Sequence, residues 1–195
     1  MKVIGLTGSI GMGKSTAAQQ FRRLHIPVFD ADAEVHRLQA LGGAAVPAIA
    51  AAFPGSVRDG RVDRHRLRAA LTAEPAGWKT LEGIMHPRVR AARRAFLARC
   101  RRRGAAIAVL DIPLLFETAP NPDVDITLVV STSAANQKAR LRRRRRMTES
   151  EIAGIIARQM SDSEKRRRAD VVVKTGLSRH YAQARIRRLV QEIRG

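Results

Sequence analysis

The chain has little cysteine, few aromatic residues and no long apolar run. Its one cysteine, Cys100, excludes an intramolecular disulfide framework and a cysteine-rich zinc site. Aromatic residues make up only 4%, so Ala, Val, Ile and Leu must build the core. No apolar run reaches the roughly 18 residues that a membrane-spanning helix needs, so we expect no membrane association. Residues 1–6 have the pattern of a β-strand and not of a signal peptide. A cytoplasmic location is therefore expected.

Acidic residues are also scarce. The 195 residues include 17 Asp and Glu against 37 Lys and Arg, a formal net charge of +20, and 31 of the 37 are Arg. Such an excess is typical of nucleic-acid-binding proteins. Here, however, the basic residues are spread over several segments and are not interleaved with the aromatic residues that a single-strand-binding surface needs. We expect no nucleic-acid partner, because a small phosphate-rich ligand suits the charge at least as well.

The order of the expected elements indicates an α/β protein with a parallel sheet between helices. Short apolar segments predict strands at residues 3–7, 27–30, 105–112, 125–130 and 170–174. Helical spacing predicts helices at residues 14–24, 31–41, 134–146 and 178–194, and a capping box formed by Thr148 and Glu151 starts another. Residues 44–103 show an irregular helical pattern without a convincing strand, which suggests a helical insertion. Trp78 is expected to anchor the core or this subdomain.

The strongest motif is Gly8-Ser9-Ile10-Gly11-Met12-Gly13-Lys14-Ser15, which fits the phosphate-binding pattern G-x-x-x-x-G-K-[ST] without a mismatch. The glycines let the backbone turn its N–H groups toward an anion, and the following helix adds its positive end. Lys14 can reach the β- and γ-phosphates, and the hydroxyl of Ser15 can bind Mg²⁺. The motif predicts a protein that binds a nucleoside triphosphate, ATP in a kinase.

Two acids follow the second expected strand, in the segment Asp30-Ala31-Asp32. Ligands of open α/β sheets gather at the carboxyl ends of strands, and a carboxylate there can accept the proton of an acceptor hydroxyl. We interpret Asp32 as this base and Asp30 as structural or metal-associated. The alternative is that one of the two caps the following helix.

Two further features could serve phosphoryl transfer. Asp111 ends an apolar strand, so it is either an acid that holds Mg²⁺ through water or an ordinary turn residue. Six of the seven residues 140–146 are Arg. Arg140 and Arg144 lie one helical turn apart on one face and could stabilise the charge of a triphosphate, although most of the run is expected to be a solvated face.

The residues together resemble the dephospho-coenzyme A kinase family, nearly from end to end. The matching segments are Ile4 to Thr16, Val28 to Asp32, His86-Pro87, Pro113 to Glu117, Gln137 with Arg140 and Arg144, and Gln159 with Lys165 and Ala169-Asp170. The resemblance implies a P-loop kinase with a five-stranded parallel sheet. Its core would be residues 1–35, 105–135 and 168–195, with a helical acceptor-binding subdomain at about 36–104 and a lid at about 136–167.

The implied reaction transfers phosphate from ATP, with Mg²⁺, to the ribose 3′-hydroxyl of 3′-dephospho-CoA, the last step of coenzyme A synthesis. By resemblance, the catalytic residues are Asp32, Lys14, Arg140 and Arg144. The ATP-binding residues are Gly8, Gly11, Met12, Gly13, Lys14, Ser15 and Thr16, with Thr175 and Gly176 near the adenine. The acceptor side is lined by Thr7, Asp32, His86, Leu115, Phe116 and Glu117. Ser15, and Asp111 through water, are the candidate Mg²⁺ ligands.

Two rival functions fit part of the sequence. Shikimate and gluconate kinases also place an Asp-x-Asp after the second strand. The first 35 residues therefore do not distinguish these kinases from the dephospho-coenzyme A kinase family. The helical insertion and residues 113–117 favour dephospho-CoA as the acceptor. A basic nucleic-acid-binding ATPase is the rival from another class.

Overall fold

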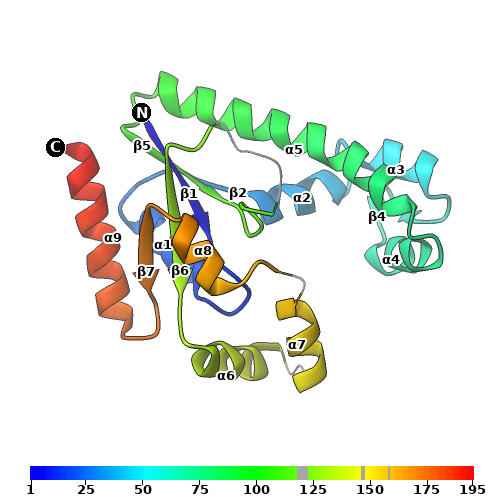
Figure 1. Ribbon diagram of the computed structural model, residues 1–195. Coiled ribbons are helices and arrows are strands. Elements are labelled where there is room, and N and C mark those ends of the chain that lie inside the picture. The colour runs from blue at the N-terminus through cyan, green and yellow to red at the C-terminus, as the bar shows by residue number, and fades with distance from the viewer. Residues whose placement is uncertain (118–122, 146–147, 158) are drawn as a thin grey trace. The chain divides into compact units, whose positions relative to one another are not determined.

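The computed structural model describes residues 1–117, 123–145, 148–157 and 159–195, and for residues 144, 145 and 149 it describes the backbone alone (Figure 1). The chain divides into two compact units. The first comprises Met1–Phe29 and Cys100–Gly195, and the second comprises Asp30–Arg99. The helical insertion expected at about residues 36–104 overlaps the second unit. Across the described ranges, no helix is both long and apolar enough to cross a membrane.

A five-stranded sheet organises the first unit. Its strands are β1 (Lys2–Thr7), β2 (Val28–Asp30), β5 (Ile107–Asp111), β6 (Ile126–Ser131) and β7 (Val171–Lys174), in the order β2-β5-β1-β6-β7. β1 pairs in parallel with β5 and β6, and β6 with β7. The strands are mostly apolar between their ends because both faces of a parallel sheet are covered. The predicted five-stranded parallel sheet is confirmed.

Helices cover this sheet. Helix α1 (Lys14–Arg23) contacts β1 and β5, α8 (Asp162–Arg168) contacts β6, and α9 (Arg179–Arg194) contacts β7. Helices α6 (Ala134–Arg145) and α7 (Glu149–Ala157) also belong to the first unit. α1 packs on α9, and α9 lies beside β7 (Figure 1). Their apolar faces share one core with β1, in which Ile4, Leu6, Phe21 and Ile186 are almost wholly buried. This core fixes the start of α1, where the phosphate-binding motif ends.

The capping box before α7 forms as predicted. The N–H of Thr148 donates to the Glu151 carboxylate at 2.8 Å, and the N–H of Glu151 donates to the Thr148 hydroxyl at 3.3 Å. The backbone N–H of Thr148, followed by its hydroxyl, lowers the pKa of Glu151. The start of this helix is therefore stabilised by a contact between residues three apart in the sequence.

The second unit is mostly helical, with its own core. It contains α2 (Ala31–Gln39), α3 (Val46–Ala52), α4 (Arg64–Ala73) and most of α5 (Gly77–Arg102). Its buried side chains include Leu38, Ile49, Leu67, Leu71 and Met85. Trp78, which was expected to anchor this core, is instead 51% exposed, so that expectation was wrong.

A short hairpin interrupts the helices of the second unit, where no strand was expected. β3 (Val57–Arg58) pairs antiparallel with β4 (Arg61–Val62). Asp59 and Gly60 connect them with φ values of 49° and 71°, as a tight hairpin turn requires. Two-residue strands are too short to produce an alternating pattern. Only the Asp-Gly pair signalled this hairpin.

Candidate active site

The loop between β1 and α1 has the backbone shape of an anion cradle. Gly11 and Gly13 have φ values of 79° and 97°, and Gly13 directly precedes the first turn of α1. A Cβ on Gly13 would lie 3.1 Å from the hydroxyl oxygen of Thr175. Glycine is therefore needed there for its conformation and for space. The helix end and the turned backbone direct N–H groups to one place, which fits a phosphate group.

Lys14 and Asp111 meet at the carboxyl end of the sheet. Lys14 Nζ lies 2.6 Å from Oδ1 of Asp111, whose side chain is 3% exposed. The neighbouring strands β1 and β5 bring the two together, because Leu6 pairs with Asp111. The ion pair compensates the buried carboxylate. The last residue of β5 is thus more than an ordinary turn residue.

Arg140 reaches the phosphate loop from α6. Its Nη1 donates to the Gly11 carbonyl at 3.3 Å and to the Thr175 hydroxyl at 3.0 Å, and its Nη2 donates to the Thr175 carbonyl at 2.6 Å. The Thr175 hydroxyl in turn donates to the carbonyl of Met12 at 2.6 Å. Arg140 and Thr175, 35 residues apart, therefore form one network with the phosphate loop. A second cation besides Lys14 is held beside the cradle.

The remaining residues assigned to ATP divide into buried and accessible ones. Met12 is buried, and its sulfur accepts from the N–H of Thr132 at 3.3 Å. Ser15 is exposed in the first turn of α1, and Thr16 is half-buried in the same turn. Ser15 and the carboxylate of Asp111 supply hydroxyl and carboxylate oxygens, the donor types that Mg²⁺ prefers. The donor set fits Mg²⁺ bound with a triphosphate.

Arg144 lies in α6, one turn beyond Arg140. Its side chain is outside the part of the chain that the structure describes.

Gly176 follows Thr175 at the end of β7, and a Cβ there would lie 2.4 Å from the Thr132 hydroxyl. Glycine at this position lets the segment after β7 pass close to the segment after β6.

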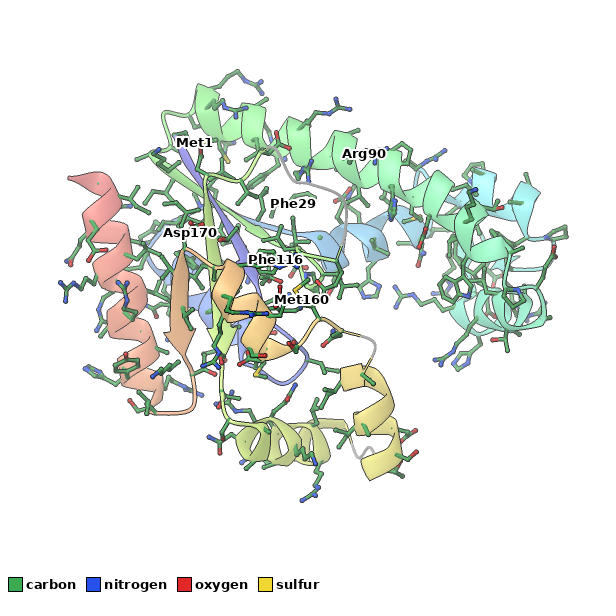
Figure 2. The ribbon with its side chains drawn as sticks, in the orientation of Figure 1. Met1, Phe29, Arg90, Phe116, Met160 and Asp170 are labelled. Atoms are coloured by element: carbon green, nitrogen blue, oxygen red, sulfur yellow. The ribbon has the colours of Figure 1, made fainter. Side chains whose placement is uncertain are left out.

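The segment after β5 is joined to the segment before α8. The Thr7 hydroxyl donates to the carbonyl of Pro113 at 2.9 Å, and Leu115 is buried. Oε1 of Glu117 accepts from the N–H of Met160 at 3.0 Å. The same oxygen lies 2.8 Å from Nζ of Lys165, which is fully buried and held by an ion pair without a well-aligned hydrogen bond. In Figure 2 the labels Phe116 and Met160 mark this junction.

In the second unit, Asp30 and Asp32 take different positions. Oδ1 of Asp30 accepts from the N–H of Ala33 at 2.9 Å, so Asp30 caps α2. Asp32 lies exposed in the first turn of this helix. His86 lies exposed within α5, directly before the internal Pro87. The capping role goes to Asp30, which leaves the carboxylate of Asp32 uncommitted to the cap.

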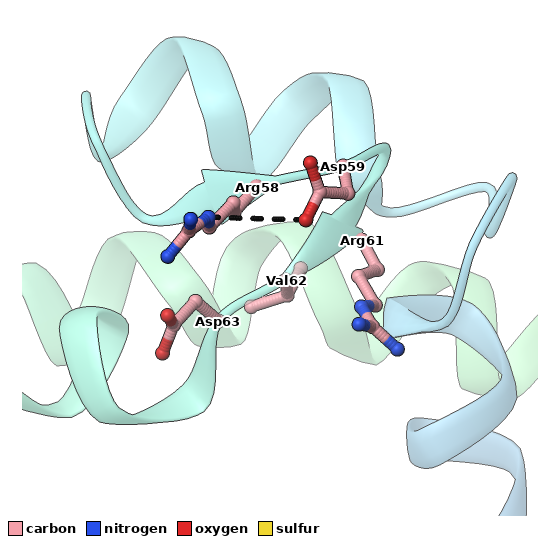
Figure 3. Close-up of a pocket in the computed structure, with 5 residues that line it drawn as sticks. All are labelled: Arg58, Asp59, Arg61, Val62 and Asp63. Carbon is pink, nitrogen blue, oxygen red and sulfur yellow. Dashed lines mark ion pairs between the residues drawn. The ribbon is translucent and has the colours of Figure 1, made fainter.

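A hollow of about 340 Å³ lies at the β3–β4 hairpin (Figure 3). Its lining residues are Arg58, Asp59, Arg61, Val62 and Asp63. Arg58 pairs with Asp59 at 3.8 Å, and Asp63 caps α4, with its pKa lowered chiefly by the N–H of Arg66. The opposite charges offset one another, so the hollow lacks the net positive charge of an anion site.

Three buried or half-buried polar side chains have contacts that the sequence did not predict. Gln137 and Gln159 both bond the backbone of Ile10 in the phosphate loop, and Lys165 pairs with Glu117. The glutamines stood out in the sequence only as parts of the family resemblance. A neutral amide at position 137, next to a long basic run, is the one local signal that could have marked it.

Known proteins match the chain over nearly all its length. The family described as dephospho-CoA kinase matches residues 2–179. A dephospho-CoA kinase of Mesorhizobium japonicum is 50% identical over 100% of this chain and 98% of its own. A solved structure from Thermus thermophilus is 31% identical with a TM-score of 0.84, covering 100% of this chain and 98% of its own. A solved dephospho-CoA kinase from Campylobacter jejuni has a TM-score of 0.75 at 23% identity, covering 99% and 98%, and shows the same fold.

Proposed function

Because the chain belongs to the dephospho-CoA kinase family, it phosphorylates dephospho-CoA with ATP, and we propose that Lys14, Arg140 and Asp32 act in this transfer. The observation that carries the proposal is the convergence of two cations, Lys14 and Arg140, on one phosphate loop. The reaction is the last step of coenzyme A synthesis. The acceptor is the ribose 3′-hydroxyl of 3′-dephospho-CoA.

We infer that the triphosphate takes the place of Asp111 as the partner of Lys14. The N–H groups of the loop bind the phosphates, and Lys14 moves from the carboxylate to the β- and γ-phosphates. Arg140, with Arg144 one turn beyond, stabilises the charge that spreads over the transferring group. Thr175 and Gly176, at the end of β7, lie on the adenine side in this proposal.

The residues fit Mg²⁺ as the companion of ATP. Ser15 would bind the metal ion directly, and Asp111, once released by Lys14, would bind it through water. When bound, Mg²⁺ neutralises phosphate charge and orients the terminal phosphoryl group.

Asp32 is the proposed base. Its carboxylate accepts the proton of the ribose 3′-hydroxyl as the oxygen attacks the γ-phosphorus. The new O–P bond forms while the bond from that phosphorus to the β–γ bridging oxygen breaks, and ADP leaves. We place Thr7, His86, Leu115, Phe116 and Glu117 on the acceptor side. Thr7 and Glu117 act there by holding the segment after β5 through Pro113 and Lys165.

The acceptor is tested with a coupled ADP-release assay. We expect turnover with 3′-dephospho-CoA and none with shikimate or gluconate, and phosphate on the 3′-oxygen by ³¹P and ¹H NMR of the product. Turnover of shikimate without turnover of dephospho-CoA would contradict the proposal. So would ATP hydrolysis that duplex or single-stranded nucleic acid stimulates in a salt-sensitive way, since we propose a small-molecule partner in the cytoplasm.

The base is tested with Asp32→Asn. We expect kcat to fall by roughly 10²–10⁴-fold, with the Kd for ATP unchanged, because the amide cannot accept the proton. Glu34→Gln is the matched control, since Glu34 lies in the same first turn of α2 and bonds Arg37. Near-normal turnover of Asp32→Asn would refute the assignment.

A further inference from the structure

Both polar groups of the Ile10 backbone are bonded by glutamine side chains. Nε2 of Gln137 donates to the Ile10 carbonyl at 2.7 Å. Oε1 of Gln159 accepts from the Ile10 N–H at 3.1 Å. Ile10 lies in the turn of the phosphate loop, where the N–H of Met12 donates to the Ser9 carbonyl at 3.1 Å. The two glutamines therefore hold the turn that precedes the phosphate-binding N–H groups.

The two glutamines come from opposite ends of the α6–α7 segment. Gln137 is in α6, three residues before Arg140, and is 4% exposed. Gln159 follows the end of α7, where its own N–H donates to the Ile156 carbonyl at 3.1 Å. The α6–α7 segment thus forms a hydrogen bond to the loop backbone from the first turns of α6 and another from just after the end of α7.

Each glutamine is itself held in place. A Cβ on Gly11 would lie 3.2 Å from Cγ of Gln137 and 3.1 Å from Cγ of Leu141, so α6 packs directly against the loop. Gln159 is followed by Met160, whose N–H donates to Glu117 at 3.0 Å. Glu117 is in turn paired with the buried Lys165. Packing of α6 against the loop therefore positions the amide of Gln137, and the hydrogen bond from Met160 to Glu117 positions the amide of Gln159.

We propose that Gln137 and Gln159 are positioning residues that hold the phosphate loop in its ATP-binding shape through the Ile10 peptide groups. The loop binds phosphate only when its N–H groups converge. If the turn at Ile10 is released, only a fraction of molecules has the competent shape, and the apparent Kd for ATP rises in inverse proportion to that fraction. Neither glutamine needs to touch ATP for this effect.

The two glutamines have opposite hydrogen-bonding roles toward Ile10. A carbonyl oxygen accepts and an N–H donates, so Gln137 must act as a donor and Gln159 as an acceptor. A carboxylate accepts but does not donate. Glutamate at position 159 should therefore keep the hydrogen bond to the Ile10 N–H. Glutamate at position 137 should lose the hydrogen bond to the Ile10 carbonyl and place a negative charge against it.

The test compares Gln137→Glu with Gln159→Glu. We expect Gln137→Glu to raise the Kd for Mg–ATP about tenfold or more, the loss of one buried hydrogen bond. Gln159→Glu keeps its hydrogen bond and should raise the Kd by clearly less, because it adds only the repulsion between its charge and the phosphates. The KM for dephospho-CoA should stay the same in both. Gln19→Glu, at an exposed position of α1, is the matched control. Equal effects of the two acids, or an unchanged Kd for both, would overturn the proposal.

Two measurements keep the test decisive. Should Gln137→Glu fail to fold in a thermal melt, Gln137→Met and Gln159→Met remove each hydrogen bond without adding charge, and both should raise the Kd for Mg–ATP. An unchanged Kd in both would reject the proposal. The inference rests only on the ATP half of the proposed function. Because Kd is measured by calorimetry without an acceptor, a wrong acceptor assignment would leave this result unaffected.

Discussion

The ammonium nitrogen of Lys14 lies 2.6 Å from Oδ1 of Asp111, although 97 residues separate them in the chain. The parallel pairing of β1 with β5 sets Leu6 opposite Asp111, and Lys14 begins the helix that follows β1. The pair joins the phosphate-binding lysine to the strand-end acid. A triphosphate that binds Lys14 must therefore change the surroundings of Asp111.

Replacing Lys14 by alanine should affect both activity and stability. We expect Lys14→Ala to lower kcat/KM by roughly 10²–10³-fold, because a cation that stabilises the transferring phosphoryl group is lost. Tm should fall as well, because the buried carboxylate of Asp111 loses its ion pair with Lys14. Steady-state kinetics and calorimetry measure the two effects. An unchanged rate would mean that the loop is not catalytic.

Asp111→Asn separates the contribution of Asp111 to stability from its proposed role in binding Mg²⁺. The amide keeps the volume of the side chain and removes the buried charge, so Tm should change little. If Asp111 binds Mg²⁺ through water, the Mg²⁺ concentration for half-maximal rate should rise about tenfold, which corresponds to 1.4 kcal/mol. The same Mg²⁺ requirement in Asp111→Asn and in the unaltered enzyme would remove Asp111 from the metal site.

Arg140→Lys tests whether charge alone is sufficient. An ammonium group cannot reproduce the fork in which Nη1 and Nη2 bond Thr175 and Gly11 together. We expect kcat/KM for ATP to fall about 10- to 100-fold, the cost of one or two charge-assisted hydrogen bonds. Arg143→Lys, at an exposed position of α6, should behave as the unaltered enzyme. A fully active Arg140→Lys would show that the network with Thr175 is dispensable.

Gly13→Ala should damage ATP binding through the backbone. At a φ of 97° an alanine is strained by about 1–2 kcal/mol, and its Cβ would press on Thr175 at 3.1 Å. We expect a lower Tm and a Kd for ATP raised at least tenfold. Gly154→Ala is the contrasting variant. In α7 nothing lies within 4 Å of its Cβ, so stability should rise by about 0.5–1 kcal/mol. Wild-type ATP affinity in Gly13→Ala would contradict the cradle geometry.

Asp170 gives the fold a predictable dependence on acid. Its carboxylate accepts from the Thr127 hydroxyl at 2.6 Å and from the Thr127 N–H at 2.7 Å. The hydroxyl first, and then the N–H, lower the pKa of Asp170 below its ordinary value of 3.8. The ionised carboxylate of Asp170 therefore adds to the free energy of unfolding above pH 3.8, its ordinary pKa. This contribution is lost as the pH falls through the lower pKa of Asp170 in the folded state.

Asp170→Asn should show this dependence in denaturant unfolding. At pH 7 we expect the variant to lose about 1 kcal/mol of unfolding free energy, and the difference from the unaltered protein should shrink toward zero as the pH falls below 3.8. Asp59→Asn is the control, because the Asp59 side chain is 74% exposed. A difference that stays constant with pH would show that the charge of Asp170 does not contribute.

Local patterns predicted the parts of the fold that depend on local chemistry. The phosphate loop, the capping box at Thr148 and the five strands were all predicted, because glycine spacing, hydroxyl–carboxylate spacing and apolar runs act within a few residues. The β3–β4 hairpin was missed because its strands are two residues long. Trp78 was misplaced because composition cannot tell a buried aromatic side chain from an exposed one.

By itself, the sequence determined that this chain is an α/β phosphate-binding kinase, since a strand, a glycine turn and the start of a helix suffice to form an anion cradle. Only the tertiary structure decided which side chains support that cradle. Asp111 with Lys14, Thr175 with Arg140, and the two glutamines on Ile10 are all far apart in the chain. Strand order and helix packing bring them together, and no local pattern in the sequence records those distances.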